Sequence, residues 1–334
     1  MSDWRQAVYK QPANLAAGAE AFADASSDLD LERLRLGTIV FAGIGASAHA
    51  LIPAVLALRA AGRRAFALQA TELVDGWAGT DPRDLADAFV LVSQSGASAE
   101  TVAALERIQG VPMVAVSARG DSPLARAADA WLPLGPEPDT PVATLSYTAT
   151  LQALGMLCDA LLGVAAPEWA RLPELTEQVL DASAVWATAL ADEFHAVTTL
   201  DTVGGGPGLA SARETALLGR EALRLPTSAM ETREYLHGPL EAVAPGFGAV
   251  IFGRERERSL ARSMASFGAQ VALVGDRGDG TKDGVAGMPL PEVSPIAAPI
   301  LQILPVQLLI DELAERRGLT IGELRRHQDD TKVA

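Results

Sequence analysis

The stretch of sequence that decides the fold is Val90-Leu91-Val92-Ser93-Gln94-Ser95-Gly96-Ala97-Ser98-Ala99-Glu100-Thr101. Apolar residues run directly into a loop rich in serine, and an alanine- and leucine-rich helical pattern follows at once. This order predicts a buried strand, a short polar loop and a helix. The first turn of a helix leaves backbone N–H groups unbonded at the positive end of the helix dipole. The loop therefore suits a bound phosphate.

A simpler interpretation of these serines is a plain strand–helix turn, in which serine is a favoured N-cap residue. Three serines and a glutamine within six residues are dense for that role, so we favour a bound ligand. The loop contains no lysine, unlike the phosphate-binding loop of nucleoside triphosphatases. A small phosphorylated metabolite is therefore the predicted ligand.

Composition narrows the class of protein. The chain has 334 residues, of which 49% are hydrophobic, and this is enough for two domains with sizeable cores. Its formal net charge of −15 argues against a nucleic-acid partner. The N-terminus lacks a signal-peptide pattern, and we expect no apolar run long enough to span a membrane. We therefore expect a cytoplasmic protein with no membrane partner.

We expect neither a metal nor a cofactor. Cys158 is the single cysteine, which excludes an internal disulfide and a multi-cysteine metal site. No grouping of histidine and carboxylate residues has the spacing of metal ligands. The glycine turn at 43–48 lacks the third glycine of a dinucleotide fingerprint, and the serine loop is not a dinucleotide feature, so we do not expect NAD.

The chain repeats itself at an offset of about 160 residues. Short apolar strand patterns pair between the halves: 37–48 with 198–210, 89–92 with 249–252, 112–116 with 269–274, and 131–134 with 288–291. Helical patterns, such as 50–61 and 259–267, fill the gaps. Strands that alternate with helices predict a parallel sheet covered on both faces. We therefore predict an α/β fold of two tandem doubly wound, flavodoxin-like domains related by pseudo-twofold symmetry.

The predicted organisation has five parts. They are an N-terminal helical arm (1–30), a first domain with the phosphate loop (31–165), a helical linker (166–190), a second domain (191–318) and a C-terminal tail (319–334). The second half has Gly253-Arg254-Glu255-Arg256 where the first has Ser93-Gln94-Ser95-Gly96. We therefore expect one phosphate site per chain, at the carboxyl ends of the first sheet.

Motifs along nearly the whole chain resemble those of the double sugar-isomerase (SIS) domain family. The motifs are Tyr9-Lys10-Gln11-Pro12, Gly45-Ala46-Ser47-Ala48-His49, Ser93-Gln94-Ser95-Gly96-Ala97-Ser98, Glu214-Thr215-Ala216-Leu217-Leu218-Gly219-Arg220-Glu221 and Glu234-Tyr235-Leu236-His237-Gly238-Pro239. The family includes the isomerase half of glutamine–fructose-6-phosphate aminotransferase, aldose–ketose isomerases, fructosamine-phosphate deglycases and glucosamine-6-phosphate deaminases. The resemblance implies a phosphorylated sugar or amino sugar as the ligand.

Several residues are expected at the substrate because of this resemblance. Ser93, Gln94, Ser95 and Ser98 are similar to the family's phosphate cradle, which agrees with the chemistry of the loop. Ser47 matches another residue of that pocket, and a simple N-cap is an equally good interpretation of it. Thr144 lies in a segment that matches a sugar-binding motif of the family.

The resemblance also implies catalytic roles. Glu221 would be the base that carries a proton between C1 and C2 of an opened sugar. Glu214 lies two helical turns earlier on the same face, and a solvated face paired with Arg213 and Arg220 is the alternative.

His237 would open the sugar ring. In the family this histidine reaches the pocket of a neighbouring subunit, so we expect a homodimer with shared active sites. Lys332 is either the family's lysine that forms a Schiff base with the open ketose or merely a charge of the tail.

The chain departs from the family at several positions. Leu218 replaces a family lysine, a second lysine is lost after Thr144, and Ala46 replaces a hydroxyl residue. No glutaminase region is recognised, so glutamine-dependent transfer is not expected. The predicted function is an aldose–ketose isomerase or isomerase–deaminase acting on a hexose-6-phosphate or amino-hexose-6-phosphate. The alternatives are a fructosamine-phosphate deglycase and a non-catalytic sugar-phosphate sensor.

Overall fold

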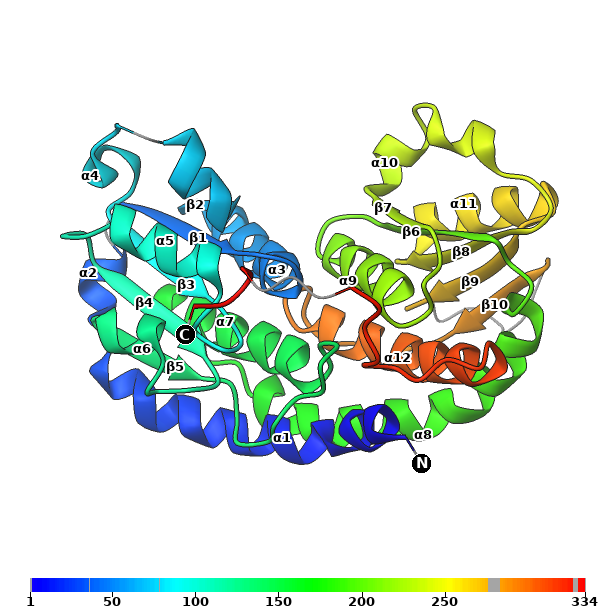
Figure 1. Ribbon diagram of the computed structural model, residues 1–334, viewed down its shortest axis with the longest axis horizontal. Coiled ribbons are helices and arrows are strands. Elements are labelled where there is room, and N and C mark those ends of the chain that lie inside the picture. The colour runs from blue at the N-terminus through cyan, green and yellow to red at the C-terminus, as the bar shows by residue number, and fades with distance from the viewer. Residues whose placement is uncertain (1, 36, 78, 276–282, 327–329, 334) are drawn as a thin grey trace. The chain divides into compact units, whose positions relative to one another are not determined.

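The computed structural model describes residues 2–35, 37–77, 79–275, 283–326 and 330–333. The chain divides into two compact units, each built around one five-stranded sheet (Figure 1). The first-sheet unit comprises Pro12–Pro138, Leu145–Pro173 and the described part of 326–334. The second-sheet unit comprises the described part of 1–11, Asp139–Thr144 and the described part of 174–325.

The first sheet is entirely parallel. Its strands are β1 (Thr38–Gly43), β2 (Arg64–Gln69), β3 (Ala88–Val92), β4 (Met113–Ser117) and β5 (Ala130–Pro133), in the order β2-β1-β3-β4-β5. Helix α2 (Leu31–Arg35) precedes them, and the helical segments between and after them are α3 (Ala46–Ala60), η2 (Glu72–Gly76), α4 (Pro82–Leu85), α5 (Ala99–Arg107), α6 (Pro123–Ala127) and α7 (Leu145–Leu162). Every residue of β3 and β4 is buried, as expected for strands covered on both faces.

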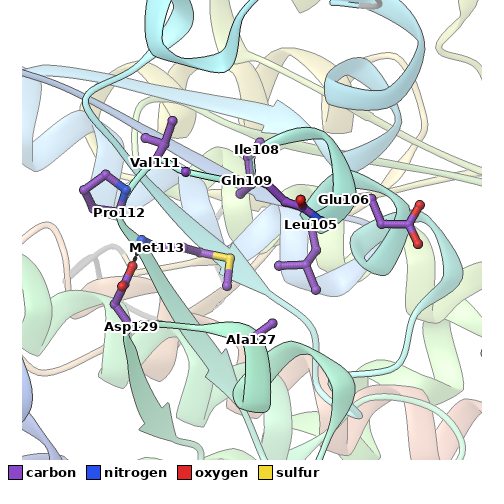
Figure 2. Close-up of a pocket in the computed structure, with 10 residues that line it drawn as sticks. Leu105, Glu106, Ile108, Gln109, Val111, Pro112, Met113, Ala127 and Asp129 are labelled. Atoms are coloured by element: carbon purple, nitrogen blue, oxygen red, sulfur yellow. Dashed lines mark hydrogen bonds between the residues drawn. The ribbon is translucent and has the colours of Figure 1, made fainter.

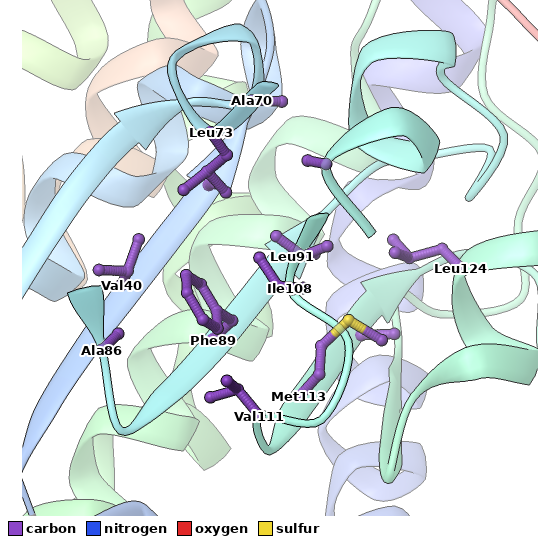
Figure 3. Close-up of a cluster of buried hydrophobic side chains, with 13 residues drawn as sticks. Val40, Ala70, Leu73, Ala86, Phe89, Leu91, Ile108, Val111, Met113 and Leu124 are labelled. Atoms are coloured by element: carbon purple, nitrogen blue, oxygen red, sulfur yellow. The ribbon is translucent and has the colours of Figure 1, made fainter. Parts of the chain in front are cut away.

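A hydrophobic cluster fixes β3 against the helices on one side of this sheet. Figure 3 shows Phe89 and Leu91 of β3 among side chains from β1, β4 and the end of α5. Phe89, Leu91 and Ala115 are fully buried, and Ile108 and Leu124 are among the other buried members of the cluster. Because β3 is held in this core, the loop that follows it begins from a fixed position.

The second sheet repeats the topology of the first. Its strands are β6 (Thr199–Gly204), β7 (Thr227–Met230), β8 (Phe247–Phe252), β9 (Gln270–Val274) and β10 (Val285–Met288), all parallel in the order β10-β9-β8-β6-β7. The helical segments are α9 (Gly208–Glu221), α10 (Thr232–Tyr235), η3 (Pro239–Ala242), α11 (Glu255–Ser266) and α12 (Ala298–Arg316). The prediction of two tandem doubly wound domains is confirmed.

One predicted strand is displaced in the structure. The repeat placed the last strand of the second half at 288–291, whereas β10 ends at Met288. Pro289 and Pro291 have no backbone N–H and so cannot continue a ladder of strand hydrogen bonds. The strand therefore uses the preceding residues, which pair with β9.

Two long helices contain the predicted arm and linker. Residues Asp3–Ala25 form α1, followed by the short turn η1 (Ser26–Asp28), and Glu168–Phe194 form α8. The division into compact units falls within each of the long helices, after Gln11 and after Pro173, and not at their ends. The predicted domain boundaries therefore stay predictions.

One described helix combines considerable length with apolar character. Helix α7 is long and apolar enough to cross a membrane by length and composition alone, with a mean hydropathy of 1.2 over 18 residues. Of that segment, 78% is buried inside the fold, which is typical of a core helix. Polar residues interrupt its apolar ones, so no continuous apolar run marks this helix in the sequence.

Candidate functional site

The serine loop connects the buried end of β3 to the first turn of α5. Ser98 occupies the N-cap position of α5, yet its hydroxyl does not cap the helix. It lies 2.9 Å from the hydroxyl of Ser93, and the Ser95 hydroxyl accepts a hydrogen bond from the backbone N–H of Ala97 at 3.2 Å. The interpretation of Ser98 as a simple helix cap is therefore wrong, and three hydroxyls gather at one helix end.

A glycine fixes the shape of this loop. Gly96 has φ +65°, and a Cβ atom added to it would lie 2.1 Å from the hydroxyl oxygen of Ser122. The carbonyl of Gly96 accepts from the N–H of Leu124, and the carbonyl of Gln94 accepts from the N–H of Ala118. The loop is thus bonded to the segment after β4, and only a residue without a side chain fits at its centre.

Ser47 lies at the same edge of the first sheet. Because β1 and β3 are parallel neighbours, their carboxyl ends meet at that edge. The N-cap of α3 is Gly45 with φ +58°, and Ser47 is the second residue of the helix, so the N-cap interpretation of Ser47 is wrong. A Cβ atom on Gly43 would lie 3.1 Å from both the Cβ of Ser47 and the carbonyl oxygen of Val92. Ser47 is therefore close to the start of the serine loop and partly exposed.

The C-terminal tail adds Lys332 to this group. Lys332 forms an antiparallel β-bridge with Ser98. The N–H of Ala99 donates to the carbonyl of Thr331 at 3.1 Å, and the N–H of Val333 donates to the carbonyl of Ala97 at 2.9 Å. Figure 1 shows the C-terminal end of the chain beside the first sheet. The structure thus places an exposed lysine next to the serine loop, more than 230 residues after it in the sequence.

Glu221 is the last residue of α9 in the second-sheet unit. Its carboxyl is half-buried, and loss of solvent, followed by the charge of Glu214, raises its pKa to about 7. Glu214 itself is fully buried, and the guanidinium of Arg220 donates to the carbonyl of Thr227. The solvated-face alternative is therefore wrong for Glu214. A carboxyl with a pKa near 7 can both accept and release a proton at neutral pH.

His237 lies in the same unit, between α10 and η3. Its side chain is exposed, and its backbone N–H donates to the carbonyl of Glu234 at 2.9 Å. Gly238 follows with φ +135°, so the chain turns sharply after the histidine. The imidazole is presented at the surface of the second-sheet unit by a tight turn.

Thr144 does not join the serine loop within one unit. It belongs to the short segment Asp139–Thr144 of the second-sheet unit, and it is fully buried. Its hydroxyl lies 2.8 Å from that of Thr140 and donates to the carbonyl of Val142, while its N–H donates to the Asp139 carboxylate. The Thr144 hydroxyl thus bonds within its own segment, 139–144. Its contact with a sugar stays a prediction.

A separate cavity of about 480 Å³ lies at the amino end of β4, away from the serine loop (Figure 2). Its walls come largely from the end of α5 and the turn into β4, and the Asp129 carboxylate there accepts from the N–H of Met113. None of the predicted site residues lines it. Among the described residues, no group of three or more histidine, cysteine or carboxylate side chains is placed to hold a metal ion.

This geometry defines a class of fold: a parallel sheet that presents a serine loop at its carboxyl edge, followed by a second copy of the same sheet. Residues 35–162 match the family model of the SIS domain. Most of the matched residues lie in the first-sheet unit, and the second sheet repeats the topology of the first.

The particular relatives are as follows. The chain is 27% identical over 328 residues to glutamine–fructose-6-phosphate aminotransferase [isomerizing] from Pyrobaculum aerophilum, covering 93% of this chain and 54% of that protein. The chain is homologous to that protein, and it spans about half the length of such relatives.

Among the solved structures that share the fold, two cover all or nearly all of this chain. The C-terminal domain of glucosamine-fructose-6-phosphate aminotransferase from Francisella tularensis superposes with a TM-score of 0.79 at 19% identity, covering 96% of this chain and 98% of that one. Glucosamine-6-phosphate deaminase from Thermotoga maritima superposes with a TM-score of 0.78 at 20% identity and complete coverage of both. The recognition of the SIS fold from sequence motifs is confirmed.

We expect Gly96→Ala to lower the free energy of unfolding by about 1–3 kcal/mol, because the new methyl group collides with Ser122 and φ is positive. Chemical denaturation measures the change. Gly110→Ala is the matched control, since Gly110 has φ +82° and no atom lies within 4 Å of the place its Cβ would take. Equal losses of stability in the two variants would contradict the inference that contact with Ser122 requires glycine at position 96.

The raised pKa of Glu221 predicts a pH-dependent cost to stability. An acid with a raised pKa binds its proton more tightly in the folded state, so stability falls as pH rises from about 4.5 through about 7. Above pH 7, Glu221→Gln should therefore raise the free energy of unfolding by about 1–2 kcal/mol, a value that allows for solvent screening. Denaturation at pH 5 and pH 8 measures it. In a carboxyl NMR titration, Glu214→Gln should lower the pKa of Glu221, and an unchanged titration would disprove the coupling.

Proposed function

We propose that this protein is an enzyme that binds a phosphorylated hexose or amino-hexose and moves a proton between C1 and C2 of the opened sugar. It would act as an aldose–ketose isomerase or as an isomerase–deaminase. The observation that carries the proposal is the serine loop, in which the hydroxyls of Ser93, Ser95 and Ser98 gather at the start of α5. Hydroxyls and N–H groups at a helix N-terminus bind phosphate without a buried cation.

The acid–base step is assigned to Glu221. Its pKa of about 7 allows the carboxylate to remove the proton from one carbon and, once protonated, to return it to the neighbouring carbon of the enediol. The exposed imidazole of His237 would open the ring by exchanging a proton with the ring oxygen or the anomeric hydroxyl.

Lys332 is proposed as the residue that holds an open ketose as a Schiff base. Its place beside Ser98 supports this role over that of a tail charge. In such a step the lysine amine adds to the C2 carbonyl and water leaves. If the substrate is an amino sugar and ammonia is released from it, the enzyme is a deaminase. The Thermotoga maritima neighbour bears the name of such an enzyme. A fructosamine-phosphate deglycase would use the same phosphate and lysine groups.

A sugar-phosphate sensor is the second candidate. Leu218 is fully buried at the position of a family lysine, so one charged group of the family is absent from α9. A sensor would need the serine loop but neither Glu221 nor His237. We favour the enzyme because both residues are present and Glu221 has a pKa suited to proton transfer.

Proton exchange with solvent distinguishes the two candidates. We expect the protein to incorporate deuterium at C1 or C2 of fructose-6-phosphate, or to release ammonia from glucosamine-6-phosphate, in NMR assays in deuterated water. Ser95→Ala should weaken sugar-phosphate binding by about 1–3 kcal/mol, and Glu221→Gln should abolish turnover while leaving binding largely intact. Ser259→Ala, an exposed change on α11, is the control. Binding without exchange or ammonia would favour the sensor.

The proposed homodimer with shared sites can be tested by mixing inactive chains. If Glu221 and His237 of one site come from different subunits, a hybrid of Glu221→Gln and His237→Ala chains contains one intact site. Activity should return on mixing, up to about a quarter of the wild-type value, since half of the dimers are hybrid and each has one of two sites. No recovery, or a fully active monomer in analytical ultracentrifugation, would refute it.

A further inference from the structure

A buried hydrogen bond joins the segment before His237 to an inner strand of the second sheet. The hydroxyl of Tyr235, the last residue of α10, donates to the Asp201 carboxylate of β6 at 2.8 Å. Tyr235 is fully buried, and Asp201 is 9% exposed. The ring of Tyr235 packs with Val203 and Ile251 of the sheet core. Tyr235 lies in the motif that contains His237, yet neither Tyr235 nor Asp201 has an assigned role so far.

A second side-chain bond holds the other end of α10. The hydroxyl of Thr232, its first residue, donates to the carboxylate of Glu257 in the first turn of α11 at 2.8 Å. Thr232 is 1% exposed. A helix of four residues is far too short to be stable by its own hydrogen bonds. The Glu231 carboxylate caps its first turn by accepting the N–H groups of Arg233 and Glu234, and the bonds of Thr232 and Tyr235 tie the helix to α11 and to the sheet.

His237 follows Tyr235 by two residues and has little support of its own. Its ring is exposed and makes no hydrogen bond to any described residue, and its backbone N–H is bonded to Glu234, inside α10. The place of the imidazole is thus set by the backbone of α10. Tyr235 is the buried residue of α10 closest to His237 along the chain.

We propose that Tyr235 is a positioning residue, which through its bond to Asp201 holds His237 at the place where the sugar ring is opened. The inference rests on the proposed function, since it assigns a purpose to the site of His237. Burial, together with the neighbouring Asp201 charge and hydrogen bond, raises the pKa of Tyr235, so its hydroxyl stays protonated and keeps donating at neutral pH. The acceptor needs only an oxygen atom, so the charge of Asp201 is not required.

Three variants separate positioning from simple stability. Tyr235→Phe deletes only the hydroxyl, and kcat for C1–C2 exchange with fructose-6-phosphate should fall by about 10- to 100-fold while KM changes by less than about 3-fold. Asp201→Asn keeps an acceptor oxygen and should retain most of the activity. Thr202→Val is the matched control, because the Thr202 hydroxyl makes buried bonds to the carbonyls of Ala212 and Ser228 and none to α10.

An NMR measurement keeps the test independent of turnover. The ring signals of His237, assigned by comparison with His237→Asn, should shift or broaden in Tyr235→Phe and stay unchanged in Thr202→Val. Loss of thermal stability in Tyr235→Phe with unaltered kcat and unaltered His237 signals would overturn the inference. An equal fall of kcat in Thr202→Val, or in Asp201→Asn, would also overturn it.

Failure of the proposed function gives a different pattern. If wild-type protein showed no exchange, or if His237→Ala exchanged as fast as wild type, the assigned role of His237 would be lost. The NMR signals would then still show whether Tyr235 holds the histidine in place. Movement of those signals supports positioning, and their constancy refutes it.

Discussion

The parallel pairing of β1, β3 and β4 is the constraint on which the rest of the first-sheet unit depends. Parallel strands end at the same edge, and each is followed by a helix whose N-terminus faces that edge. Ser47 after β1 and the serine loop after β3 therefore lie close together, although more than 40 residues separate them in the sequence. Burial of every residue of β3 anchors this arrangement.

The two copies of the sheet have diverged at the corresponding edge. Where the first copy has serines after β3, the second has Gly253 and Arg254 after β8, and the carboxylate of Glu257 accepts the N–H of Arg254. The same carboxylate accepts the hydroxyl of Thr232. The Glu257 carboxylate thus accepts hydrogen bonds from polar groups at the carboxyl edge of the second sheet. The first sheet presents serine hydroxyls at its corresponding edge.

The acidic residues of α9 show how burial converts a common side chain into a reactive one. Glu214 and Glu221 share a helix face, and both lie away from bulk solvent to different degrees. Desolvation and mutual repulsion both favour the proton on Glu221, which raises its pKa to about 7. A carboxyl with a raised pKa lowers the stability of the folded protein at neutral pH. Glu221 therefore calls for a functional explanation.

The sequence by itself determined the α/β class, the duplication and the serine loop, because apolar strand patterns, glycine turns and hydroxyl clusters are local signals. It misplaced β10, where two prolines end the strand early, and it left open for Ser47 an N-cap role that the structure gives to Gly45. Only the tertiary structure decided that Lys332 pairs with Ser98 and that Tyr235 bonds to Asp201. Those partners are 234 and 34 positions apart, and the fold of the chain, which no local pattern records, brings them together.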